Sequence, residues 1–203
     1  MRAIFAAILV LASLPASLKA GEPPSPVRDS IAQLSATVPA KPIKSVSIVP
    51  VDGSAEGGDV LIDFADGSSH RLSTAARAQA AQLGTDGQTF GFNLVAYYVD
   101  LKGDLWVTTP AIVIYRQGKR AAVIEPTKQA SVGWAFRDGS SSIMVSAQGT
   151  HGPTYLGLYD VATGKRTAQA MELDDAPKPK WTQGAPLLYC CTVKTTVAPY
   201  TQK

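Results

Sequence analysis

The chain has 203 residues, of which 45% are hydrophobic and 17% are charged. This composition supplies enough apolar surface for a folded core and excludes a wholly disordered protein. The formal net charge is only +3, and the densest basic groups are pairs such as Lys119-Arg120 and Lys165-Arg166, so the sequence lacks the basic surface that nucleic-acid binding requires.

Residues 1–20 have the pattern of a secretory signal peptide. Arg2 and the amino terminus supply positive charge, Ile4–Leu14 is almost entirely apolar, and cleavage is expected after Ala20, with Ala16 as the competing site. The alternative is a retained anchor, but the apolar stretch is shorter than the ~20 residues that a spanning helix needs. We therefore expect a periplasmic or extracellular protein that is not integral to the membrane after cleavage. Removal of two basic residues with this segment leaves 17 basic against 16 acidic residues.

Residues 21–44 are expected to form a Pro-containing N-terminal arm. Pro26–Leu34 is a candidate short helix within it, because Pro26 suits the first helical position and Ile31 and Leu34 share one face with Val27. The favoured interpretation of the segment is an arm that is docked on the domain or loose.

From Ser45 onward the pattern becomes that of β-strands. Ser45–Val51 is followed by Asp52-Gly53, and Asp59–Phe64 is followed by Asp66-Gly67. Asp-Gly between apolar runs predicts a hairpin, because a type I′ turn needs the positive φ that these residues tolerate.

Ser73–Leu83 interrupts the strand pattern. Ser73 can cap a helix, the following residues are rich in alanine and glutamine, and Gly84 can end it, so we expect a short Ala-rich helix here.

Short apolar runs separated by turn residues then continue to the end of the chain, and they predict a series of antiparallel strands. The predicted strands are Phe90–Val99, Asp104–Thr108, Ala111–Arg116, Arg120–Ile124, Ser131–Phe136, Ser141–Ser146, Tyr155–Val161, Arg166–Leu173 and Leu187–Val193. We expect a single β-rich domain over residues 45–200, mainly antiparallel, built as a β-sandwich or as a partial propeller-like meander.

Two segments of the chain echo one another. Phe64-Ala-Asp-Gly-Ser-Ser69 and Phe136-Arg-Asp-Gly-Ser-Ser141 agree at five of six positions. The second begins a unit that continues to Tyr155-Leu-Gly-Leu-Tyr-Asp-Val-Ala-Thr-Gly-Lys165. Over residues 131–173 this unit resembles a blade of a β-propeller of the WD40-like or TolB type, and residues 90–124 resemble one more faintly.

The length of the domain limits what that resemblance implies. Propeller blades take roughly 40–45 residues and a closed ring needs at least four. Residues 45–200 are too few for a standard single-chain ring once the Ala-rich segment is subtracted. The resemblance therefore implies a β scaffold whose function resides in its loops, and it carries no catalytic residues to transfer.

Cys190-Cys191 is the most unusual pair in the sequence. Four alternatives are open: free thiols with at least one buried, a strained vicinal disulfide, an intermolecular disulfide, and a metal or redox site. The Cys-x-x-Cys spacing typical of the last alternative is absent.

The candidate binding residues are His151, Tyr155 and Trp181. His151 lies in a glycine-bracketed loop and Trp181 in a polar, lysine-containing segment, where a tryptophan can act either as a recognition residue or as a cover for the core. His70 is interpreted as an ordinary surface histidine. Asp59, Asp63 and Asp66 lack the ligand order of an EF-hand, so they are interpreted as strand-edge and turn residues, and no metal or other cofactor is expected.

The function expected from these features is non-catalytic binding of a protein partner or an envelope component. A small inhibitor or immunity-type protein that blocks an envelope-acting enzyme is the first alternative. An enzyme of unrecognised type is the second, although no Gly-x-Ser-x-Gly motif accompanies the two histidines.

Overall fold

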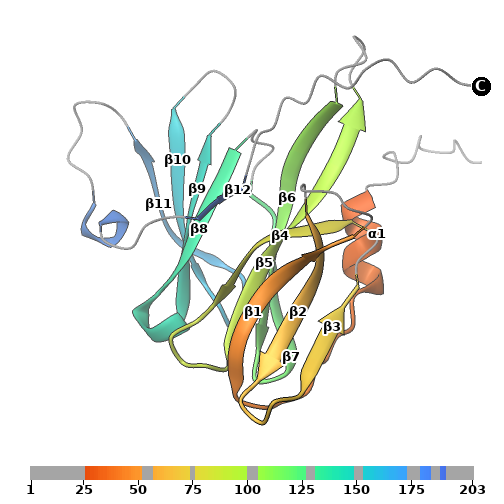
Figure 1. The fold of residues 1–203 in the computed structure, drawn as a ribbon. Helices are drawn as coiled ribbons and strands as arrows, with labels where there is room; N and C mark the ends of the chain where they lie inside the picture. Colours follow the sequence, from red (N-terminus) through yellow and green to blue (C-terminus); the bar gives the residue numbers. More distant parts are fainter. Residues whose placement is uncertain are drawn as a thin grey trace, which may run out of the picture.

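Two antiparallel β-sheets and one α-helix form the part of the chain that the structure describes (Figure 1). The structure is a computed structural model, and it describes residues 26–51, 57–73, 76–99, 105–126, 131–148, 153–172, 179–183 and 188–190. The predicted signal peptide, His151 and Cys191 lie outside these ranges. No helix among the described residues is long and apolar enough to span a bilayer.

The first sheet has the strand order β1-β2-β4-β5-β6-β7, with β3 paired to β2. Its strands are β1 (Ile43–Pro50), β2 (Gly58–Phe64), β3 (Ser69–Leu72), β4 (Arg77–Leu83), β5 (Thr89–Val99), β6 (Leu105–Arg116) and β7 (Lys119–Ile124).

The second sheet has the order β11-β10-β9-β8-β12. Its strands are β8 (Ser131–Arg137), β9 (Ser142–Gln148), β10 (Thr154–Asp160), β11 (Arg166–Glu172) and β12 (Leu188–Cys190). The helix α1 spans Pro26–Gln33, and short 3₁₀ segments occupy Asp138–Ser140 and Lys180–Thr182. The prediction of a mainly β, antiparallel fold with one short helix is confirmed, and the described residues form two sheets and no closed ring of blades. The resemblance to a propeller blade stays a prediction.

The Ala-rich helix predicted over Ser73–Leu83 is wrong, because Arg77–Leu83 is strand β4. This strand pairs with β5 from Arg77, opposite Val95, to Leu83, opposite Phe90, and a bulge interrupts the pairing near Ala80, which has a φ of 50°. Helix propensity is a weak preference that tertiary pairing overrides. The helix of this fold is instead α1, at the position of the candidate helix in the arm.

Strand β6 is continuous where the sequence predicted two strands separated by Pro110. The register with β5 shifts beside this proline, since Leu94 pairs with Ala111 and Ala96 pairs with Thr108. Pairing of β6 with β7 begins only at Ile112. Proline is tolerated in a strand at a bulge, where a ladder hydrogen bond is already missing.

Strand β6 also separates two hydrophobic cores. Ala111, Val113 and Tyr115 belong to the core enclosed by the first sheet and α1, whereas Ile112 and Ile114 belong to the core between the sheets. All five side chains are fully buried. A strand covered on both faces has a continuous apolar sequence instead of an alternating one, as this one does.

Trp134 of β8 joins the two sheets. Its side chain is fully buried and packs in the same core as Ile112 and Ile114. Opposite it lies Gly91 of β5, where an added β-carbon would come within 2.6 Å of Ile114 Cδ1 and 2.9 Å of Trp134 Cη2. The absence of a side chain at Gly91 is therefore what lets the indole approach the first sheet.

Helix α1 is docked on the first sheet by hydrogen bonds to its backbone and side chains. The buried Ser30 hydroxyl accepts a hydrogen bond from the Ala76 backbone N–H. At the other end of the helix, the Arg120 guanidinium donates to the carbonyl oxygens of Ile31 and Leu34. Leu34 is 4% exposed and belongs to the core of the first sheet.

The two echoing Asp-Gly segments both form turns between neighbouring antiparallel strands, as predicted. Asp138, Gly139 and Ser140 all have positive φ, at 51°, 62° and 71°, and the Ser141 N–H donates to the Asp138 carbonyl oxygen, so Gly139 and Ser140 are the central pair of this turn. In the other segment only Gly67 has positive φ, at 84°, so the same letters form a different turn.

Substitution of Gly91 by alanine is expected to separate the sheets. Overpacking a filled core costs about 1–3 kcal/mol of unfolding free energy, and urea unfolding monitored by tryptophan fluorescence would measure it. Gly67→Asn is the control, because an added β-carbon there meets no heavy atom within 4 Å and asparagine tolerates a positive φ. Equal stability of the two variants would contradict the assigned contact.

Substitution of Ser30 by alanine is expected to lower the unfolding free energy by about 1–3 kcal/mol, since it leaves the buried N–H of Ala76 without its acceptor. Ser35→Ala is the matched control, because the exposed Ser35 hydroxyl donates to the Thr37 carbonyl and accepts from the Thr37 N–H, and water can replace both bonds. Chemical denaturation of both variants tests the docking of α1. A loss confined to the control would contradict it.

Candidate functional site

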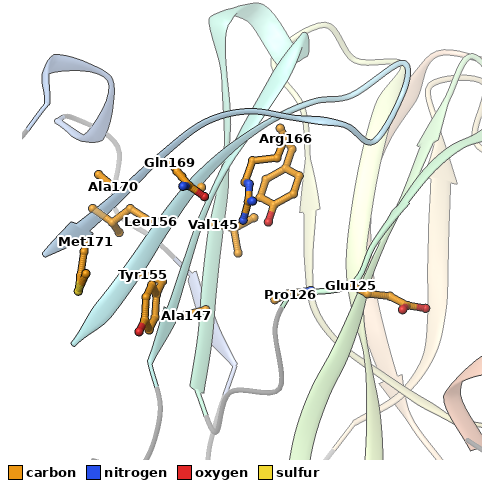
Figure 2. A pocket seen from close by; sticks show the side chains of 12 residues that line it. Glu125, Pro126, Val145, Ala147, Tyr155, Leu156, Arg166, Gln169, Ala170 and Met171 are labelled. Atoms are coloured by element: carbon orange, nitrogen blue, oxygen red, sulfur yellow. The ribbon is translucent and has the colours of Figure 1, made fainter. Parts of the chain in front are cut away.

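A groove of about 590 Å³ lies along the second sheet, beside strands β10 and β11. Strands β9, β10 and β11 form its floor, and Glu125 and Pro126 at the end of β7 form the facing wall. In Figure 2, Tyr155 and Met171 lie near each other toward one end of the groove, and Arg166 projects from the same hairpin. Glu125 and Pro126 approach from the first sheet.

Strand alternation explains which side chains reach the floor. Tyr155, Gly157 and Tyr159 are two residues apart, so they share one face of β10. The register sets Tyr155 between Ala147 of β9 and Met171 of β11. Ala147, Tyr155 and Met171 therefore form a row across the three strands, which begins in the core between the sheets and ends in the groove.

The exposure of the side chains changes along one such row. Ala147 is 5% exposed and belongs to the core, whereas Tyr155 is 45% and Met171 is 46% exposed. They are the two large hydrophobic side chains that are exposed among the described residues. The first sheet therefore covers only part of the second, and the groove contains the part left uncovered.

Gly157 gives the centre of the floor its shape. A β-carbon added there would lie 2.6 Å from Cε2 of Tyr159, so the tyrosine ring lies against the bare backbone of Gly157. Tyr159 is half-buried against the core between the sheets. The ring and the glycine therefore lie next to the exposed Tyr155 on the same face of β10.

The polar groups of the groove come from β11 and from the end of β7. Arg166 and Gln169 are exposed side chains on β11, and Glu125 is exposed on the facing wall. A register shift at the start of the hairpin pairs Arg166 with Tyr159, which brings Arg166 onto the floor side. Within the described ranges Arg166 has no ion-pair partner.

The β10–β11 hairpin is held by a hydrogen-bonded turn at Asp160. The Asp160 carboxylate accepts hydrogen bonds from the Thr163 backbone N–H at 2.8 Å and from the Thr163 hydroxyl at 2.6 Å. These bonds stabilise the charged carboxylate and so lower the pKa of Asp160 below its ordinary value of 3.8. The bond from the Thr163 hydroxyl has the larger effect, and the bond from the Thr163 N–H comes next. Gly164, with a φ of 67°, completes the turn through its N–H to the Asp160 carbonyl oxygen.

Of the two predicted binding residues that the structure describes, Tyr155 lies in the groove and Trp181 does not. Trp181 is half-buried in the 3₁₀ segment Lys180–Thr182. The carbonyl of the neighbouring Gln183 accepts a hydrogen bond from Arg137 at 2.9 Å, which connects this segment to β8. His151 lies outside the described residues, as does Cys191, and Cys190 is placed only by its backbone, opposite Val132 in β12.

Sequence reasoning missed Met171, Arg166 and Gln169 as groove residues. A signal was present, because alternation along Arg166–Glu172 sets Gln169 and Met171 on one side of a strand. Selecting them needed the register with β10 and the knowledge that no other strand among the described residues covers Tyr155, and the local sequence shows neither.

The three aspartates of the first sheet are engaged in structural contacts. Asp59 pairs with Arg71 at 2.7 Å, and Asp66 pairs with Lys41 at 2.7 Å. Asp63 accepts hydrogen bonds from the hydroxyl groups of two serines. Within the described segments, no three His, Cys, Asp or Glu side chains gather as a metal site would require.

Comparison with protein-family models found no match, and comparison with curated proteins also found none.

Acid is expected to weaken the hairpin through Asp160. Because its pKa is lowered in the folded state, the carboxylate stabilises the fold above pH 3.8, and this contribution is lost as the pH falls through the lower folded pKa. Urea midpoints of the wild type and of Asp160→Asn should therefore differ most above pH 3.8 and converge in stronger acid. A difference that does not change with pH would contradict this role.

Proposed function

We propose that the chain is a secreted or periplasmic, non-catalytic binding protein whose groove along β10 and β11 receives a protein partner or an envelope component. The observation that carries the proposal is the exposed pair Tyr155 and Met171, which lies in a groove that is also lined by charged and amide side chains. Concave sites with an apolar surface and a few polar groups are typical of binding sites.

The exposed pair supplies both apolar area and a shape. Full burial of a large apolar side chain contributes roughly 1.5–3 kcal/mol, so covering the exposed half of each contributes on the order of 1 kcal/mol. The aromatic ring of Tyr155 also has a hydroxyl group, which suits a surface that is wet on one side. Arg166, Gln169 and Glu125 supply the directional contacts that would orient the ligand.

The proposed site lies on the surface of a sheet, whereas the sequence predicted it in loops. The sequence pointed to the loop residue His151 and to Trp181, whereas the groove is built on strands with fixed register. A site on strands is held more rigidly than a site on loops, which lowers the entropy lost when a ligand binds.

Capture of partners with three immobilised proteins tests the proposal. The wild-type chain from Gly21, the Tyr155→Ser/Met171→Ser variant and the His151→Ala/Trp181→Ala variant are exposed to envelope and secreted fractions of the producing cell. Bound proteins and glycans are identified and quantified by mass spectrometry. The groove variant is expected to lose affinity by roughly 30-fold, which corresponds to about 2 kcal/mol.

Circular dichroism and thermal unfolding of each variant provide the folding control. If no species is retained through the groove residues, or if only the His151/Trp181 variant loses its ligand, the groove is not the binding site.

A further inference from the structure

Strand β11 is the outermost strand of the second sheet, and it borders the groove. Within the described part of the chain, no strand pairs with its outer edge. An edge strand presents a row of backbone N–H and C=O groups, and natural proteins often protect such a row with prolines or charges. The centre of β11, Thr167–Met171, has neither.

We infer that the groove's ligand is an extended segment of a protein partner that adds to β11 as a sixth strand of the second sheet. The inference rests on the proposed function and specifies its ligand. An extended peptide offers its own backbone groups at the strand repeat, so it can satisfy the edge of β11 along its length, which a glycan cannot do. In this mode the backbone ladder provides affinity and alternate side chains provide specificity.

The register of the hairpin then determines which partner side chains face the groove. A partner residue opposite Met171 would extend the row of Ala147, Tyr155 and Met171, so an apolar side chain is expected there. A residue opposite Gln169 would extend the row that contains Gly157, where the Tyr159 ring covers the backbone.

The charge of the groove specifies the other end of the partner. Arg166 is exposed, lines the groove and has no ion-pair partner in the described ranges. An acidic residue of the partner would pair with it, about 14 Å along the strand from the apolar residue at Met171, because the bulge shortens β11 to the four-residue span from Tyr155 to Tyr159. Glu125 on the facing wall disfavours a partner with several acidic residues.

Selection from a random dodecapeptide library displayed on phage provides the probe. Phage are selected on the wild-type chain from Gly21 and depleted on the folded Tyr155→Ser/Met171→Ser variant. The expected peptides combine an apolar residue with an acidic residue farther along an alternating sequence. The strongest peptide is then synthesised unmodified, with N-methyl groups on its odd-numbered residues, and with N-methyl groups on its even-numbered residues.

Affinities of the three peptides, from fluorescence anisotropy, test strand addition directly. Consecutive N–H groups of a strand point to opposite edges, so only one of the two methylated sets faces β11. One methylated peptide should lose roughly tenfold or more in affinity while the other binds within about threefold of the parent. Arg166→Glu should weaken the parent peptide, and replacement of the peptide's acid by lysine should restore binding.

Several outcomes would overturn the inference, and they are separable from failure of the proposed function. Equal binding of both methylated peptides would mean that the peptide occupies the groove without joining the sheet. Enrichment of no peptide, together with groove-dependent binding on a glycan array, would leave the groove as a site for another ligand class. Light scattering that shows a dimer which excludes peptide would assign the edge to a second copy. If the Tyr155/Met171 variant retains every ligand of the wild type, the proposed function fails as well.

Discussion

The close approach of Trp134 to the bare backbone of Gly91 is the contact on which the arrangement of the two sheets depends. It lets a large indole fill the space between β8 and β5, and the aliphatic side chains of β6 close the core around it. Because β6 is buried on both faces, this strand contributes side chains both to the core shared with α1 and to the core shared with the second sheet. A change in the distance between the sheets at Gly91 and Trp134 would therefore disturb the packing of both cores.

The groove follows from this packing and from the width of the second sheet. The first sheet covers β8 and β9, whose inward side chains are buried, and its cover ends before the far side of β10. Tyr155 and Met171 lie on the same inward face of the second sheet as the buried Ala147, but they are exposed to solvent. Glu125 and Pro126 at the end of β7 form the wall opposite them. The apolar floor is thus an extension of the core, held in register by β9 and by the Asp160 turn.

The sequence was informative wherever local chemistry decides the structure. The turn at Asp138-Gly139 and most of the strands follow from residue types and short-range spacing. It failed at Arg77–Leu83, because alanine favours a helix in isolation and only the partner strand β5 makes this segment extended. The alternation of small and polar residues from Ala76 to Gln79 was the signal against a helix. The groove was only partly predictable, since Tyr155 could be selected as an aromatic residue but its neighbour Met171 depends on register and on what remains uncovered.

The residues at the exposed end of the groove are separate from the residues of the Trp134 contact, and this separation has an evolutionary consequence. Tyr155 and Met171 belong to neither hydrophobic core, whereas Trp134 and its neighbours are buried in one. Substitutions at the groove end therefore carry little folding cost, and a lineage can exchange them to follow a changing ligand while the sheet-to-sheet contact is retained. The scaffold in this way separates the residues that must be kept from the residues that are free to diversify.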